Sequence, residues 1–185
     1  DKDALFLYMH IPFCEIRCGF CNLFTTIHPG QSLETAYLDT LNIQAKRVHE
    51  ALDGASFARM AIGGGTPTYL NPDELTQLFA IAANIMQVDL KNTPASVETS
   101  PLTSTTARLQ ILRDHHVDRI SIGIQSFIEE EVRAAGRAQK TRDVHLALER
   151  IRAVGFPTLN LDLIYGLPGQ TVSSWIESLQ MALMY

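Results

Sequence analysis

The sequence predicts an α/β protein in which parallel strands alternate with helices in an incomplete barrel. Five apolar runs with strand-like patterning alternate with segments whose apolar residues recur at helical spacing. Strands joined through helices favour a parallel sheet with right-handed crossovers. No Gly-x-Gly-x-x-Gly sequence follows the first run, which argues against a dinucleotide-binding open sheet. The 185 residues fall short of the roughly 200 to 250 of a complete eight-stranded barrel, so we expect a partial parallel barrel of about five β/α units.

The first half of the chain contains three of the expected strands, at residues 4–11, 57–62 and 95–99. Between the first two, residues 33–52 carry apolar side chains at helical spacing. Asn71 followed by Pro72 predicts the start of the next helix, because Asn caps helix N-termini and Pro fits the first turn.

The second half continues the alternation. The expected elements are a helix over 103–116, a strand over 119–124, a helix capped by Thr141, a strand over 158–164 and a helix starting near Thr171. Gly155 is expected to end the helix that begins at Thr141, because glycine readily adopts the left-handed conformation of helix C-termini. The last helix is expected to run on unfinished to Tyr185.

Composition excludes several classes of protein. The chain is 46% hydrophobic with a net charge of -5, and no basic block interleaves with aromatic residues, so we expect no nucleic-acid partner. The apolar run over 78–88 is interrupted by Asn84 and Gln87, so no membrane span is expected. The N-terminus lacks a signal-peptide layout and an initiator Met, and we expect a fragment of a longer cytoplasmic protein.

The three cysteines, Cys14, Cys18 and Cys21, all follow the first strand closely. A secreted disulfide framework normally has an even number of cysteines spread along the chain. The C-x3-C-x2-C spacing instead predicts three thiolate ligands on one loop, with a further metal position left open for catalysis. Two alternatives stay open on the loop alone: His10 could complete a zinc site with the three cysteines, or the thiols could be free.

Polar residues recur where the expected strands end. Catalytic groups of β/α barrels lie at the carboxyl ends of the strands. The residues placed there are His10, Glu98, Gln125 and Asp162, together with the cysteines and a glycine-rich segment after the second strand. Unpartnered polar groups are costly to bury, so we expect a polar ligand at the mouth of the barrel. The alternative is a structural hydrogen-bond network.

The glycine-rich segment comprises Gly63, Gly64, Gly65 and Thr66. Without a Cβ its backbone N–H groups could approach a ligand closely, although a tight connection that needs positive φ is the simpler alternative. The segment lacks the Lys-Ser or Lys-Thr of a P-loop, which favours an amino-acid-like ligand over a nucleoside triphosphate. Arg137 could bind the carboxylate of such a ligand, or be a solvated charge.

Four motifs together resemble one known family. The cysteine segment with Gly-Gly-Gly-Thr-Pro after the second strand is similar to the radical S-adenosylmethionine superfamily. The stretches 8–14, 63–68, 119–127 and 160–171 resemble its oxygen-independent coproporphyrinogen III oxidase-like branch. The resemblance extends over the whole chain and implies that residues 1–185 form the core domain, without a sixth β/α unit and a C-terminal domain that selects the substrate.

The resemblance implies an oxidoreductase-like enzyme with a 4Fe-4S cluster held by Cys14, Cys18 and Cys21. S-adenosylmethionine would bind the fourth iron, and its reductive cleavage would give a 5′-deoxyadenosyl radical that abstracts hydrogen from the substrate. The residues implied to contact this molecule are Tyr8, Gly64 and Glu98, with Phe20 shielding it. The residues that match a second S-adenosylmethionine site are Gly65, Thr66, Gln125, Arg137 and Asp162.

One position departs from the oxidase. Where that enzyme has a further cysteine, two residues after the third ligand, this chain has Leu23. The resemblance therefore extends to paralogues, among them haem chaperones, radical methyltransferases and cyclopropane-forming enzymes. The implied substrate is a tetrapyrrole or another large planar molecule, and the implied partner is an external electron donor such as flavodoxin or ferredoxin.

Overall fold

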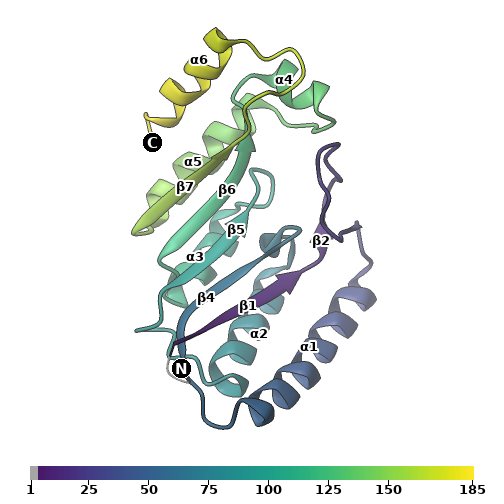
Figure 1. The fold of residues 1–185 in the computed structure, drawn as a ribbon, viewed down its shortest axis with the longest axis vertical. Coiled ribbons are helices and arrows are strands. Elements are labelled where there is room, and N and C mark those ends of the chain that lie inside the picture. Colours follow the sequence, from purple (N-terminus) through teal and green to yellow (C-terminus); the bar gives the residue numbers. More distant parts are fainter. Residues whose placement is uncertain (1–3) are drawn as a thin grey trace.

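The computed structural model describes residues 4–185 and contains one five-stranded parallel sheet (Figure 1). Its strands, in spatial order, are β1 (Leu5–Ile11), β4 (Phe57–Gly64), β5 (Ala95–Thr99), β6 (Arg119–Gln125) and β7 (Thr158–Leu163). Every neighbouring pair is parallel, which confirms the predicted α/β class. Within residues 4–185, β1 and β7 are the sheet edges, so the barrel is open.

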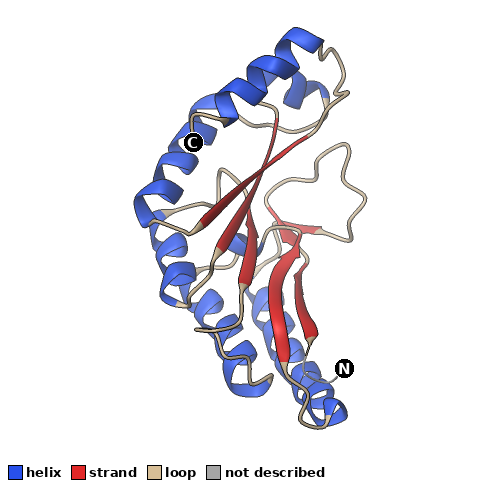
Figure 2. Cartoon of the chain, turned by 60° about the vertical axis from the view of Figure 1, so that its left-hand side comes forward, coloured by secondary structure: helices blue, strands red, loops and turns tan. Residues whose placement is uncertain are grey.

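Helices cover one face of this sheet, and the cysteine loop lies on the other side (Figure 2). The helices that follow the strands are α1 (Gln31–Leu52), α2 (Pro72–Ala80), α3 (Thr106–Asp114), α5 (Thr141–Val154) and α6 (Val172–Ala182). A continuous apolar core fills the space between the two layers, and it includes the fully buried Ile122, Leu78 and Leu112. Burial of this apolar area is the main favourable contribution to folding.

Alternation along the strands decides what faces the barrel interior. In β1, Met9 and Ile11 are buried in the core, while Tyr8 and His10 are more exposed on the opposite face. In β7, Asn160 and Asp162 share a face, as their spacing predicts, and their side chains are hydrogen-bonded to each other. The concave side of the sheet is therefore its polar side.

Two predicted helix ends are confirmed by their geometry. The Asn71 side chain accepts a hydrogen bond from the Glu74 backbone N–H at 3.0 Å, and the Glu74 carboxylate accepts one from the Asn71 N–H at 2.9 Å. This reciprocal pair is a capping box that fixes the start of α2. At the end of α5, Gly155 adopts a φ of +79°, the left-handed conformation in which side chains are strained.

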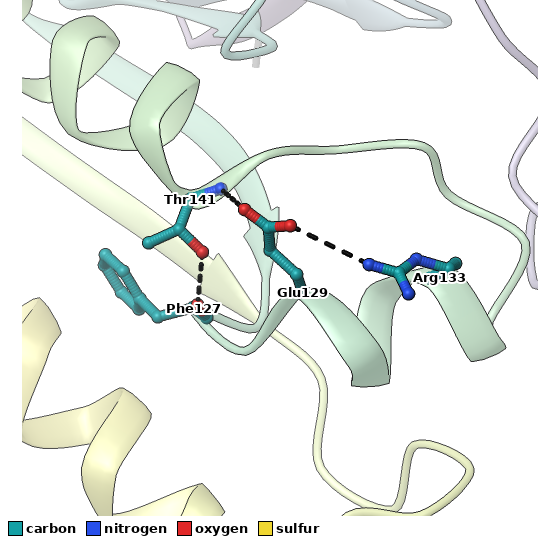
Figure 3. Close-up of polar contacts among 4 residues, drawn as sticks. All are labelled: Phe127, Glu129, Arg133 and Thr141. Atoms are coloured by element: carbon teal, nitrogen blue, oxygen red, sulfur yellow. Dashed lines mark hydrogen bonds and ion pairs between the residues drawn. The ribbon is translucent and has the colours of Figure 1, made fainter.

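The expected cap of α5 differs from the prediction. Lys140 is the N-cap, and Thr141 is the first helical residue. The backbone N–H of Thr141 donates to the Glu129 carboxylate at 2.8 Å, and its hydroxyl donates to the Phe127 carbonyl at 2.9 Å (Figure 3). Glu129 opens α4 (Glu129–Ala134), a short helix that the sequence did not predict, so a carboxylate from a neighbouring helix satisfies the N–H group.

Other boundaries shift for local reasons. The helix expected over 103–116 starts only at Thr106, because Thr103 and Ser104 belong to a buried hydroxyl network with Thr68 and Thr99. Helix α6 ends at Ala182 instead of running on to Tyr185. The short elements not predicted are β2 (Phe13–Cys14), β3 (Thr26–Ile27), a 3-10 turn at Pro67–Tyr69 and a π-helical turn at Ile81–Ile85.

Candidate functional site

A cavity of about 240 Å³ lies at the carboxyl ends of the five strands. Loops after β1, β4, β5 and β6, together with the interior of β7, all contribute to it, as expected of a β/α barrel. The predicted site residues that line it are Cys14, Cys18, Phe20, Cys21, Gly64, Gly65, Thr66, Glu98, Gln125, Arg137 and Asp162. The fold thus brings together residues separated by much of the sequence.

Tyr8 is the predicted site residue outside this lining. It lies within the β1 strand, where its hydroxyl is 3.2 Å from the His10 Nδ1. Both residues line a second hollow of about 220 Å³ beside α1. Burial raises the pKa of the Tyr8 phenol, and the charge of Glu98 raises it further, so Tyr8 is electrostatically connected to the site.

The cysteine loop is anchored by backbone hydrogen bonds. At its base, the N–H groups of Thr26 and His28 donate to the carbonyls of Pro12 and Cys14, forming the small sheet of β2 and β3. Inside the loop, the Cys21 N–H donates to the Cys18 carbonyl at 3.0 Å. The three thiols are free, and Cys14 is buried.

The thiols influence one another electrostatically. Burial raises the pKa of the Cys14 thiol, and the neighbouring Cys21 and Cys18 raise it further. The Thr66 hydroxyl, 3.7 Å from the Cys14 sulfur, acts in the opposite direction. A bound cation would remove this mutual repulsion by stabilising the thiolates.

The donor set fits an iron–sulfur cluster. Three thiols border one cavity, and thiolates are the usual ligands of such clusters. Among residues 4–185, no three His, Cys, Asp or Glu side chains are close enough to hold one metal ion. His10, the candidate fourth zinc ligand, does not line the cavity with the cysteines. Cys14, Cys18 and Cys21 are the sulfur donors that line this cavity.

The glycine segment is hydrogen-bonded to neighbouring parts of the chain. The N–H of Gly64 donates to the Glu98 carboxylate at 3.1 Å, and those of Gly65 and Thr66 donate to the carbonyls of Ile11 and Phe13. These N–H groups therefore have partners within the protein, as the alternative of a tight connection expects. Glycine is required here because a Cβ on Gly65 would lie 2.8 Å from the Cys14 sulfur.

Close packing against side chains explains the two preceding glycines, which belong to β4. A Cβ on Gly63 would lie 2.8 Å from the Glu98 carboxyl carbon, and one on Gly64 would lie 2.5 Å from the His10 ring. Gly64 also has a φ of +118°. Because Gly63 and Gly64 have no Cβ, the side chains of Glu98 and His10 can pack directly against the backbone of β4.

Two carboxylates, those of Glu98 and Asp162, line the same cavity. Desolvation raises the pKa of Glu98 and the charge of Asp162 adds to this, while the Gly64 N–H bond and His10 oppose it. Asp162 accepts hydrogen bonds from Ser121 at 2.8 Å and from Asn160 at 2.7 Å. Repulsion between two such groups favours a cationic ligand between them.

Arg137 lies between α4 and α5 and lines the cavity. Its guanidinium donates to the Cys18 sulfur at 3.3 Å, to the Gly123 carbonyl at 2.8 Å and to the Gln139 side chain at 2.8 Å. Gln139 lines the cavity too, and its amide donates to the Ile124 carbonyl. Sequence reasoning missed Gln139 because a polar residue in a loop carries no pattern of its own.

A buried network supports the turn after β6. Gln125 has a φ of +71°, unusual for a residue with a side chain. The neighbouring Ser126 donates to Glu131 at 2.7 Å, and Gln170 donates to the same carboxylate at 2.9 Å. Burial acts to raise the pKa of Glu131, but hydrogen bonds from Ser126, Ser174 and Gln170 outweigh it and lower the pKa. The network holds the strained turn in place.

Five apolar residues belong to the cavity lining, and we refer to them as its apolar wall. They are Ile16, Phe20, Leu23, Pro101 and Leu102. Leu23 and Leu102 keep 45% and 46% of their surface exposed, so they are available for contact with a ligand. Ser121 and Leu102 also line the cavity but were not predicted, because nothing in the sequence distinguishes them from ordinary strand and loop residues.

The sequence matches the Radical SAM superfamily over residues 8–182. It is 32% identical over 95% of its length to heme chaperone HemW of Bacillus subtilis, covering 46% of that protein. It is 35% identical over 97% of its length to the oxygen-independent coproporphyrinogen III oxidase of Escherichia coli, covering 39% of that enzyme. The chain thus spans less than half the length of these relatives.

The fold agrees with these matches. The solved structure of coproporphyrinogen III oxidase (HemN) from Escherichia coli superposes with a TM-score of 0.90 and 31% identity, covering all of this chain and 42% of that one. The methyltransferase TsrM from Kitasatospora setae shares the fold at 12% identity and a TM-score of 0.68. Within residues 4–185, no helix has the length and hydropathy to cross a membrane. The chain therefore belongs to the radical SAM superfamily, in the branch that resembles oxygen-independent coproporphyrinogen III oxidase.

Proposed function

We propose that this chain is the core of a cytoplasmic radical S-adenosylmethionine enzyme acting on a tetrapyrrole or another large planar substrate. The family implies a 4Fe-4S cluster and S-adenosylmethionine. The observation that carries the proposal is the convergence of three free thiols, two carboxylates and an apolar wall on one cavity. When bound, the two cofactors supply the electron and the radical, as in other cofactor enzymes where the protein provides placement.

The residues of this chain would hold and orient the cofactors. Cys14, Cys18 and Cys21 would ligate the cluster, leaving one iron position for an exogenous ligand. Glu98, fixed by its bond from Gly64, would accept a hydrogen bond from the ammonium group of a methionyl ligand. The missing Cβ of Gly63 allows the close approach of Glu98 on which this orientation depends, and that of Gly64 allows the close approach of His10.

Asp162 and its neighbours would bind the more distal part of a ligand. Ser121 and Asn160 aim the Asp162 carboxylate, whose remaining acceptor capacity suits ribose hydroxyls or an ammonium group. Gln125, Thr66 and Gly65 line the same cavity, which supports one or two S-adenosylmethionine molecules there. Phe20 lies on the apolar wall, where it would shield the site from water.

The second candidate function is a haem chaperone on the same scaffold. Leu23, an apolar residue lining the cavity where the oxidase motif has a cysteine, favours it, and HemW of Bacillus subtilis is a relative of this kind at 32% identity. A chaperone would bind haem and transfer it to an acceptor without consuming S-adenosylmethionine. An external electron donor such as flavodoxin or ferredoxin is needed only by the enzyme.

The first experiment is anaerobic iron and sulfide analysis, with electron paramagnetic resonance of the reduced protein. We expect about four irons per chain and a spectrum that changes when S-adenosylmethionine is added. One zinc without sulfide, and no cluster on reconstitution, would refute the proposal. Formation of 5′-deoxyadenosine in reductant would then favour the enzyme, whereas stoichiometric haem transfer without it would favour the chaperone.

A further inference from the structure

The cysteine loop contacts a segment from the far side of the barrel mouth. The Gly19 N–H donates to the Ala135 carbonyl at 3.1 Å, although two strands separate β1 from β6 in the sheet. A Cβ on Gly19 would lie 2.8 Å from that carbonyl oxygen, and one on Gly136 would lie 3.0 Å from the Gly19 nitrogen. Figure 1 shows the loop after β1 approaching the segment around α4. The two backbones therefore pack together without intervening side chains.

Arg137 follows directly and binds a cysteine sulfur. Its Nη1 donates to the Cys18 Sγ at 3.3 Å. Its Nη2 donates to the Gly123 carbonyl and its Nε to the Gln139 side chain, each at 2.8 Å. Gln139 is itself fixed by its bond to the Ile124 carbonyl at 2.8 Å. A guanidinium is rigid and planar. Its bonds to Gly123 and Gln139 therefore fix the direction of Nη1, which points at the Cys18 sulfur.

We propose that Arg137 is a positioning residue that holds Cys18 and raises the reduction potential of the cluster. This inference rests on the proposed function, in which Cys18 is a cluster ligand. Hydrogen bonds to cluster sulfurs and nearby charge set iron–sulfur potentials. A positive donor stabilises the more negative, reduced form, so the cluster accepts an electron at a higher potential. This role is separate from any contact between Arg137 and S-adenosylmethionine.

The test compares two single-charge changes on neighbouring segments. Arg137→Gln removes the donor to Cys18, whereas Arg133→Gln removes an equal charge from α4. Arg133 is 69% exposed and its ion pair is with Glu129, so it serves as the matched control. Iron and sulfide are measured first in each full-length protein. The midpoint potential is then obtained by anaerobic redox titration without S-adenosylmethionine, monitored by electron paramagnetic resonance.

We expect Arg137→Gln to lower the midpoint potential by about 59 mV, a tenfold change in the reduced-to-oxidised ratio for a one-electron couple. Arg133→Gln should leave the potential unchanged. A fully loaded Arg137→Gln protein with the wild-type potential would overturn the inference, as would an equal shift in both variants. A wild-type protein without a cluster would instead refute the proposed function.

A second variant, Arg137→Lys, keeps the inference testable if Arg137→Gln fails to assemble the cluster. Arg137→Lys keeps the charge but cannot make the three-way contact, and we expect a smaller shift in the same direction. If Arg137→Gln holds no cluster and Arg137→Lys retains the wild-type potential, the hydrogen bond to Cys18 does not set the potential, and the tuning role of that bond is refuted.

Discussion

Two thiols of the cysteine loop contact different parts of the chain. Cys14 is buried beside Thr66, after β4, whereas Cys18 is bound by Arg137, after β6. The loop therefore depends on the assembled barrel for its shape. A cluster would in turn stabilise the barrel, because a ligand that binds only the folded state adds its binding free energy to folding.

Cys18→Ala is expected to abolish cluster assembly, because two thiolates cannot hold the cluster in place. Iron and sulfide per chain after anaerobic reconstitution measure the effect. Leu102→Ala, on the apolar wall of the same cavity, is the control and should keep its full iron content. A full iron load in Cys18→Ala would show that Cys18 is not a ligand.

Asp162→Ala is expected to keep the cluster but weaken binding of S-adenosylmethionine or substrate. Loss of one charge-assisted hydrogen bond corresponds to about 1.5 to 3 kcal/mol, or at least tenfold in affinity. Equilibrium binding to the reconstituted protein measures it. Asp89→Ala, in an exposed turn away from the cavity, is the control. Unchanged affinity for both ligands would make Asp162 a structural partner of Ser121 and Asn160.

At the scale of the elements, α1 and α2 meet through two buried carboxyl groups. Glu34 in α1 and Glu74 in α2 are both buried, and the Gln31 amide donates to Glu74. Burial raises the pKa of Glu34, and the charge of Glu74 and a hydrogen bond with it raise it further. This contact between helices therefore favours a protonated Glu34.

The contribution of Glu34 to the free energy of unfolding is expected to decrease as the pH rises. Because the pKa of Glu34 is higher in the folded state, its contribution to stability is present below the unfolded value of 4.5 and is lost as pH rises through the folded value. We expect Glu34→Gln to gain stability relative to wild type over that range. Urea unfolding at a series of pH values measures this, with the exposed Glu50→Gln on the same helix as control. A difference in unfolding free energy between Glu34→Gln and wild type that stays constant with pH would contradict the prediction.

The capping box of α2 provides a second prediction for this element. Asn71→Ala removes the acceptor for the Glu74 N–H and should cost about 1 kcal/mol of unfolding free energy. Asn92→Ala breaks a hydrogen bond to Asp89 in an exposed turn, and should cost less than about 0.5 kcal/mol. Chemical denaturation of both proteins compares them, and equal losses would show that the cap adds nothing specific.

At the scale of the whole molecule, the cavity connects all five β/α units. Its lining comes from every strand of the sheet or from the loop that follows it. A ligand bound there would link both sheet edges, β1 and β7, through the cysteine loop and Asp162. Such a ligand should stabilise the domain as a unit.

We therefore expect S-adenosylmethionine at a hundred times its dissociation constant to raise the unfolding free energy of the cluster-loaded protein by about 2.7 kcal/mol. Amide hydrogen exchange should slow at the carboxyl ends of β1 and β7 together. Asp162→Ala at the same ligand concentration is the control and should show less stabilisation. Protection confined to one edge would mean that the ligand does not connect the units.

The sequence by itself determined the order and type of the main elements and the residues that gather at the site. The spacing of apolar residues along a short segment differs between strands and helices. The five strands and the helices that follow them could therefore be predicted from the sequence. Parallel strands place their carboxyl ends at one edge, so Glu98, Gln125 and Asp162 could be expected near the cysteines.

The tertiary structure alone decided how these residues are connected. The N–H groups of the glycine segment are taken up by Glu98, Ile11 and Phe13, which no local pattern indicates. Helix α4 forms where Glu129 can satisfy the first N–H of α5, a contact between separate elements. The bond from Arg137 to Cys18 joins residues far apart in the chain. Hydrogen bonds between distant segments depend on the assembled barrel, and periodicity carries no information about them.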